Sequence, residues 1–146
     1  MNNSTHSELF QRIETSFLRQ GMMQILGVRL LRAEFGLCEL ALPHSDRVAQ
    51  QQGSFHGGAM GTLADVAGGY AALSAAPPGM EVTTVEFKIN FLASFTGGEL
   101  RATGRVVKAG KRIIVATAEV MHVDDTGKQT ICAVMQQTLV PVPKTY

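Results

Sequence analysis

The sequence predicts an α+β domain in which one antiparallel β-sheet wraps around a long central helix. Residues 56–76 form a Gly- and Ala-rich run that is too long for a strand and apolar on all sides, as expected of a helix buried on most faces. Strand-like runs precede and follow it, and short turns between the later runs imply antiparallel neighbours. With 146 residues, 45% apolar and only 17% charged, we expect one folded domain over residues 1–146.

Before the central helix, the sequence predicts another helix and two strands. The first helix covers about residues 5–20, because Thr5 and Glu8 match a capping box, apolar residues then recur at helical spacing, and Gly21 ends the pattern. Residues 28–42 are expected to form two short strands around a turn, and a polar loop follows them.

After the central helix, the sequence predicts four strands. Apolar and polar residues alternate strictly with a period of two from Thr84 to Phe91. Gly-containing turns then separate three further runs. The expected strands cover residues 82–92, 100–108, 112–123 and 130–140. Together with the two strands at 28–42 and the central helix, these strands are expected to make a core that spans about residues 25–140.

Composition excludes several classes of protein. A net charge of +1 argues against nucleic-acid binding, which normally requires a basic face. The sequence shows neither an apolar run long enough to span a membrane nor a secretory signal at its start, so we expect a cytoplasmic protein without membrane contacts. Cys38 and Cys132 lie in apolar strand-like runs and are expected to be reduced core residues.

The central helix carries a single formal charge, Asp65. An ionised carboxylate in such apolar surroundings is destabilising unless it is paired or hydrogen-bonded. It is therefore either a structural group that reaches a donor, or a carboxylate that desolvation prepares for work as a general base or nucleophile. The many glycines of this helix would also let other backbone approach it closely.

His56-Gly57-Gly58 begins the same helix after the polar loop. The first N–H groups of a helix lack internal partners and carry the positive end of its dipole. Without side chains at Gly57 and Gly58, a ligand oxygen can approach these donors, which would make an oxyanion site. The alternative is that the two glycines only form a tight turn.

The spacing between these two features predicts an oligomer. Gly58 and Asp65 are seven residues apart, so they share a helix face but lie about 10.5 Å apart along the axis. A carbonyl held at Gly58 is beyond hydrogen-bond reach of Asp65 on the same helix. We therefore expect the acid and the oxyanion donors of one site to come from two copies of the chain.

One stretch of the sequence consists of the segment Gln50-Gln-Gln-Gly-Ser-Phe-His56-Gly57-Gly58, then Asp65 after six further residues, and then the alternating strand 82–92. This stretch resembles the hotdog-fold acyl-CoA thioesterases, above all their PaaI-like branch. The resemblance covers roughly residues 25–140. It implies a hotdog fold whose subunits join their sheets in a homodimer, or in a homotetramer of paired dimers. It also implies hydrolysis of an aryl- or short- to medium-chain acyl-CoA to free acid and CoA, without a cofactor.

The resemblance assigns roles by position. Asp65 would be the nucleophile or the general base that activates water, and the Gly57 N–H, with Gly58 nearby, would polarise the thioester carbonyl. A hydroxyl of the next strand would assist the acid, for which Thr84 is the best match and Thr83 its neighbour.

Two further positions match the family pattern less directly. Related enzymes often carry an Asn where this sequence has Gln50, which keeps the amide on a longer arm. His56 would order the loop at the start of the helix, with direct proton transfer as the less favoured role. The other histidines show no spacing typical of a metal site, so no metal is expected.

The substrate's phosphates and acyl group suggest further candidates. Four basic residues surround the turn at 109–110 and either line the CoA path or form a solvated hairpin tip. They are Arg105, Lys108, Lys111 and Arg112. Four apolar residues either line an acyl pocket or belong to the core. They are Phe55, Met60, Tyr70 and Phe91.

Two other functions remain open from the sequence. One is a hotdog enoyl-CoA hydratase or dehydratase, although the Pro-Gly-rich helix start of those enzymes is missing here. The other is a non-catalytic acyl-CoA binding module, because a fold alone does not define a function.

Overall fold

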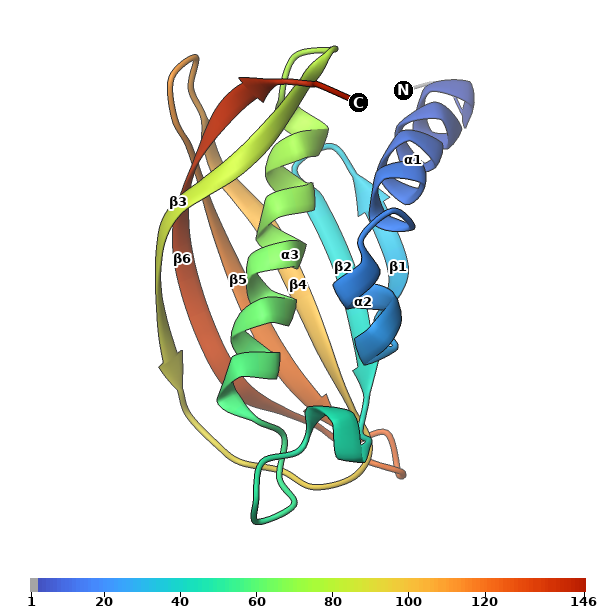
Figure 1. Ribbon diagram of the computed structural model, residues 1–146, viewed down its shortest axis with the longest axis vertical. Helices are drawn as coiled ribbons and strands as arrows, with labels where there is room; N and C mark the ends of the chain where they lie inside the picture. The colour runs from blue at the N-terminus through green and yellow to red at the C-terminus, as the bar shows by residue number, and fades with distance from the viewer. Residues whose placement is uncertain (1–2) are drawn as a thin grey trace.

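The computed structural model describes residues 3–146, and their side chains from residue 8 onward (Figure 1). The elements in chain order are α1 (Asn3–Phe17), α2 (Gly21–Leu26), β1 (Arg29–Glu34), β2 (Leu37–Pro43), a 3₁₀ turn (Asp46–Val48), α3 (Gly57–Ala75), β3 (Met80–Phe91), β4 (Glu99–Ala109), β5 (Ile114–Val123) and β6 (Gln129–Pro143). The predicted α+β architecture is confirmed: six strands form one sheet, and the long helix lies against it.

All neighbouring strands pair antiparallel, in the order β1-β2-β4-β5-β6-β3. In Figure 1 the sheet curves behind α3, and α1 and α2 lie on the side of β1. The order leaves β1 and β3 as the two edge strands of the described residues. Strand β3 pairs with β6 and borders the side of α3 opposite β1.

The N-terminal region differs from the expectation in its boundaries. The first helix ends at Phe17 rather than near residue 20, and Gly21 begins the short helix α2 instead of ending α1. Helix α2 ends at Gly27, whose φ of 80° is the left-handed conformation that glycine favours at this position. The capping box expected from the Thr5 side chain lies outside the described side chains.

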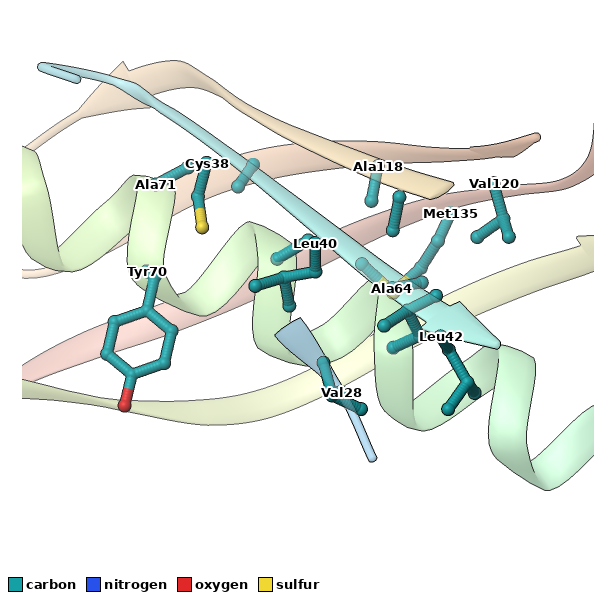
Figure 2. Close-up of a cluster of buried hydrophobic side chains, with 14 of the residues drawn as sticks. Val28, Cys38, Leu40, Leu42, Ala64, Tyr70, Ala71, Ala118, Val120 and Met135 are labelled. Atoms are coloured by element: carbon teal, nitrogen blue, oxygen red, sulfur yellow. The ribbon is translucent and has the colours of Figure 1, made fainter. Parts of the chain in front are cut away.

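The core fills the space between α3 and the concave face of the sheet. Ala64 and Ala71 of α3 have no exposed surface and pack near Leu40 and Leu42 of β2 (Figure 2). Both cysteines are buried and free, as predicted. None of the helices in the described part of the chain is long and apolar enough to cross a membrane.

The closest approach between helix and sheet depends on a glycine of the sheet. A Cβ on Gly104 of β4 would lie 2.2 Å from the carbonyl oxygen of Ala67. The expectation that the helix's own glycines allow close backbone approach is wrong for Gly61 and Gly69, because a Cβ at either position would meet nothing within 4 Å. Gly68 does allow a close approach, but by the side chain of Gln137, 1.7 Å from such a Cβ.

Strand β3 contains a β-bulge at Val85. Thr84 pairs with Leu139 and Glu86 with Thr138, so Val85 has no partner of its own. The strict alternation expected from Thr84 to Phe91 is therefore wrong at this point. Because of the bulge, Thr84 and Phe87 both point toward α3, where regular alternation would have placed them on opposite faces of the sheet.

Candidate active site

Asp65 lies in the middle of α3, half-buried, on the side that faces β3 and β6. Its Oδ1 accepts two hydrogen bonds, one from Thr84 Oγ1 and one from Gln137 Nε2, each of 2.8 Å. No hydrogen bond to Oδ2 occurs within the described part of the chain. The carboxylate is thus held from one side by two donors, while its second oxygen remains available.

Gln137 was not predicted from the sequence. It belongs to β6 and has no exposed surface. A signal was available, because Gln137 falls in phase with the buried residues Ala133, Met135 and Leu139 of the same strand, and a buried amide requires hydrogen-bond partners. Only the packing of α3 against β6 shows that this partner is Asp65.

Asp65 borders two clefts. The first, of about 500 Å³, extends toward α1 and the C-terminus and is lined by Val66, Tyr70 and Val82, among others. The Tyr70 hydroxyl lies 3.1 Å from Ser16 Oγ and accepts a hydrogen bond from Gln20 Nε2, and burial raises the pKa of this phenol. The hydroxyl therefore remains protonated in neutral solution and available as a polar group at the edge of the cleft.

The second cleft, of about 570 Å³, connects Asp65 with the N-terminus of α3. The helix side of this cleft consists of Gly57, Gly58, Gly61 and Thr62, and the opposite side includes the aromatic rings of Phe87 and Phe91. A Cβ on Gly57 would lie 3.3 Å from the Phe91 ring, so this ring lies directly over the start of the helix. One continuous cleft thus brings together the acid, the helix N-terminus and apolar walls.

The first two N–H groups of α3 differ in their hydrogen bonding. Gly58 N–H donates to His56 Nδ1 over 2.7 Å, so the exposed His56 ring caps the helix, as the sequence suggested. The Gly57 N–H makes no hydrogen bond within the described residues. Of the two donors expected for an oxyanion, Gly57 is therefore the one that is open to a ligand.

Several expected site residues do not meet Asp65 within one subunit. The Gln50 side-chain oxygen accepts the N–H of Gln52 in its own loop, and Gln50 lines neither cleft. Phe55 is only 2% exposed, and its ring packs edge-on against His44 and His122. Thr83 is exposed on β3, with its side chain on the face opposite that of Thr84.

The expected CoA-binding cations lie elsewhere on the subunit. Arg105 lines a groove on the outer face of the sheet together with Lys88 and Glu119. The other three, Lys108, Lys111 and Arg112, line a shallow pocket at the β4–β5 turn. Of the expected acyl-pocket residues, Phe91 lines the second cleft and Tyr70 the first, whereas Met60 is buried in the core.

The arrangement contains no candidate metal centre among the described residues, since no three His, Cys, Asp or Glu side chains gather closely enough to hold an ion. What it offers is a carboxylate with a free oxygen and, about 12 Å away along the same helix, an N-terminus with an open N–H. These are the groups that acyl transfer to water requires: a base for the water and a donor for the carbonyl oxygen.

The chain belongs to the thioesterase superfamily, which matches residues 52–128, just over half of its length. A 1,4-dihydroxy-2-naphthoyl-CoA hydrolase of Listeria monocytogenes is 30% identical over 108 residues, which cover 74% of this chain and 86% of that protein. A thioesterase family protein of Silicibacter pomeroyi has a crystal structure that superposes with a TM-score of 0.89 at 37% identity, over 93% of this chain and 99% of that one.

The PaaI protein from the phenylacetic acid degradation operon of E. coli superposes with a TM-score of 0.82, over 96% of this chain and 97% of its own. At 23% identity this likeness concerns the fold. The comparisons confirm the hotdog fold and identify the protein as a thioester hydrolase, which sets aside the hydratase and the binding-module alternatives.

Proposed function

We propose that the protein hydrolyses an aryl- or short- to medium-chain acyl-CoA to the free acid and CoA, without a cofactor. The observation that carries this proposal is the Asp65 carboxylate, held by Thr84 and Gln137 at the junction of two clefts, one of which leads to the open end of α3. The naphthoyl-CoA hydrolase among the relatives and the aromatic wall of the second cleft both favour an aromatic acyl group.

In the proposed reaction, Asp65 Oδ2 removes a proton from a water molecule, whose oxygen attacks the thioester carbonyl carbon. The carbonyl oxygen becomes negatively charged and accepts a hydrogen bond from the Gly57 N–H. When the tetrahedral intermediate collapses, the C–S bond breaks and the CoA sulfur leaves with the proton that Asp65 took up. The products are the carboxylic acid and the CoA thiol. In the nucleophilic alternative, Asp65 Oδ2 attacks the carbonyl carbon, the C–S bond breaks and the CoA thiolate leaves; water then hydrolyses the resulting anhydride, and its proton passes to the thiolate.

We further propose that each site combines Gly57 of one subunit with Asp65 of another. The helical rise separates Gly57 and Asp65 of one subunit by about 12 Å, too far for both groups to act on one carbonyl. The surface for such a dimer is β3, an edge strand with the exposed apolar side chains Val85, Phe87 and Phe91. Exposed apolar edge strands of this kind favour pairing with another chain.

The experiment is a hydrolysis screen over aryl, short, medium and long acyl-CoA esters, with free thiol as the signal. We expect turnover with at least one class and a loss of about 100-fold or more in kcat for Asp65→Asn, as for removal of a general base. Asp124→Asn is the matched control, because Asp124 holds a turn far from the clefts through bonds to Thr126. Unchanged turnover in the Asp65 variant contradicts the mechanism.

Isotope transfer separates the two roles of Asp65. A single turnover in ¹⁸O-labelled water places the label in the acid product when Asp65 acts as a general base. In the nucleophilic route, water that attacks the Asp65 carbon of the anhydride places the label in the Asp65 carboxylate and leaves the acid product of that turnover unlabelled, so label in Asp65 identifies this route.

A further inference from the structure

Gln137 is an amide buried completely beside the carboxylate that the proposed function makes the base. Its Nε2 lies 2.8 Å from Asp65 Oδ1, 3.2 Å from Thr84 Oγ1 and 3.4 Å from the main-chain oxygen of Asp65. The opposite orientation of the amide would set its carbonyl oxygen against a carboxylate oxygen. The contacts to Asp65 therefore fix Nε2 as the atom that faces the acid.

The carbonyl oxygen of the same amide lacks the hydrogen bonds that its Nε2 makes. Gln137 Oε1 is buried and has no hydrogen-bond partner within the described residues. It lies against Gly68, where a Cβ would be only 1.7 Å away. An unsatisfied buried carbonyl lowers stability, and an apolar side chain such as those of Met135 and Leu139 would avoid this loss.

The stability of the core therefore does not explain why an amide occupies position 137. The hydrogen bond from its Nε2 to Asp65 does explain it. We propose that Gln137 is a positioning residue for hydrolysis: it fixes Oδ1 of Asp65, so that Oδ2 points to the cleft as the proton acceptor. Hydrogen bonds to a charged form favour that form. This inference rests on the proposed function, since it concerns the same site.

Other charged or titratable groups also share the first cleft with Asp65. They come from four parts of the fold: Arg19 follows α1, Tyr70 lies on α3, Glu81 on β3 and Tyr146 at the C-terminus. The Tyr146 hydroxyl donates to Glu81, and the Arg19 guanidinium lies 4.4 Å from the centre of the Tyr146 ring. These groups thus contact one another, while the two side chains that hydrogen-bond to the acid are Thr84 and Gln137.

The test uses the full chain with Gln137→Met, which keeps the volume and removes the amide. We expect kcat to fall about 10- to 100-fold, as for loss of a hydrogen bond to a charged group, with KM little changed. The acidic limb of the pH–rate profile should move to higher pH, because the ionised carboxylate has lost a donor. The melting temperature should be unchanged or higher, because the unsatisfied carbonyl is gone as well.

The matched control is Gln136→Met. Gln136 is the preceding residue of β6 and is exposed on the outer face of the sheet, away from the clefts with Asp65. Its kcat, pH profile and melting temperature should equal those of the wild type. A common effect of Gln-to-Met changes on this strand would show itself in both variants.

Gln137→Glu is the second variant. It keeps the shape of the side chain, so it tests the role of Gln137 even if Gln137→Met does not fold. The new carboxyl lies against Asp65, and two adjacent carboxylates cannot both ionise easily. We expect the acidic limb of the pH–rate profile to move to a higher pH than in Gln137→Met. A wild-type protein that hydrolyses no acyl-CoA overturns the proposed function, and the role of Gln137 with it. An active wild type whose two Gln137 variants keep its kcat and acidic limb overturns the role of Gln137 alone.

Discussion

At the scale of single residues, the two oxygens of Asp65 have different surroundings. Oδ1 is engaged by Thr84 and Gln137, and Oδ2 makes no hydrogen bond within the described part of the chain. A carboxylate held through one oxygen cannot rotate freely, so its other oxygen keeps one direction. Such fixed orientation is what general-base catalysis needs, since the proton acceptor must stay within hydrogen-bond reach of the water.

Thr84→Val removes one of the two donors without a change of shape. We expect kcat to fall about 10-fold, as for one hydrogen bond to a charged group, and Thr84→Ser to restore most of the rate because it returns the hydroxyl. Thr138→Val is the control, because its hydroxyl also donates to a carboxylate, that of Glu86, but on the outer face of the sheet. Steady-state kinetics on one acyl-CoA measure all three variants. Equal rates for Thr84→Val and Thr138→Val would contradict the role of the Thr84 hydroxyl.

The sequence predicted the acid and one of its donors, but not the other. Asp65 stood out as the single charge of an apolar helix, and Thr84 followed from the resemblance. Gln137 is 72 residues from Asp65 in the chain, and the two meet only because α3 packs against β6. For Phe55 the sequence left the acyl pocket and the core open, and its burial favours the core.

At the scale of elements, the close contact between α3 and β4 requires a residue without a side chain at position 104. A Cβ on Gly104 would clash with the Ala67 carbonyl at 2.2 Å, and backbone on both sides leaves no flexible atom to move aside. We therefore expect Gly104→Ala to lower the free energy of unfolding by about 1–3 kcal/mol, as for an overpacked core.

Gly69→Ala is the matched change on the helix itself. A Cβ there meets nothing within 4 Å, so the better helix propensity of Ala should raise the free energy of unfolding by up to about 1 kcal/mol. Urea titration at one protein concentration compares both variants with the wild type. If Gly104→Ala proves as stable as Gly69→Ala, the close approach of helix and strand is not a constraint.

Sequence patterns predicted the existence of the helices and strands better than their details. The strands appeared where alternation and turns placed them, because those signals are local. The bulge at Val85 has no local signal in the alternating run, and it arises from the register with β6. This detail matters for function, because it turns Thr84 toward Asp65.

At the scale of the whole molecule, the buried thiols make stability depend on pH in alkaline solution. Burial raises the pKa of Cys38 to about 12 and that of Cys132 to about 11, from an ordinary value of 9.0. In the unfolded chain both thiols ionise above pH 9, while in the folded chain they remain protonated. The stability that this difference provides is fully present below pH 9 and is lost as pH rises toward 11–12.

We therefore expect the free energy of unfolding to decrease between pH 9 and pH 11 more steeply in the wild type than in a Cys38→Ala, Cys132→Ala double variant. The pKa values of Tyr70 and Tyr146 are also raised, but both tyrosines are present in both proteins, so the difference in slope isolates the thiols. Urea unfolding at several pH values gives both slopes. Parallel slopes would show that the thiols are not held protonated by the fold.

The assembly can be tested by restoring activity from two inactive variants. Gly57→Pro removes the open N–H at the first position of α3, where a helix tolerates proline, and Asp65→Asn removes the base. In a mixed dimer whose sites each combine Gly57 of one subunit with Asp65 of the other, one of the two sites is intact. Equal mixing after unfolding and refolding should therefore return about a quarter of the wild-type rate, since about half of the dimers are mixed. Sites built within single subunits would each lack one group, so a mixture as inactive as its parents would refute the shared site.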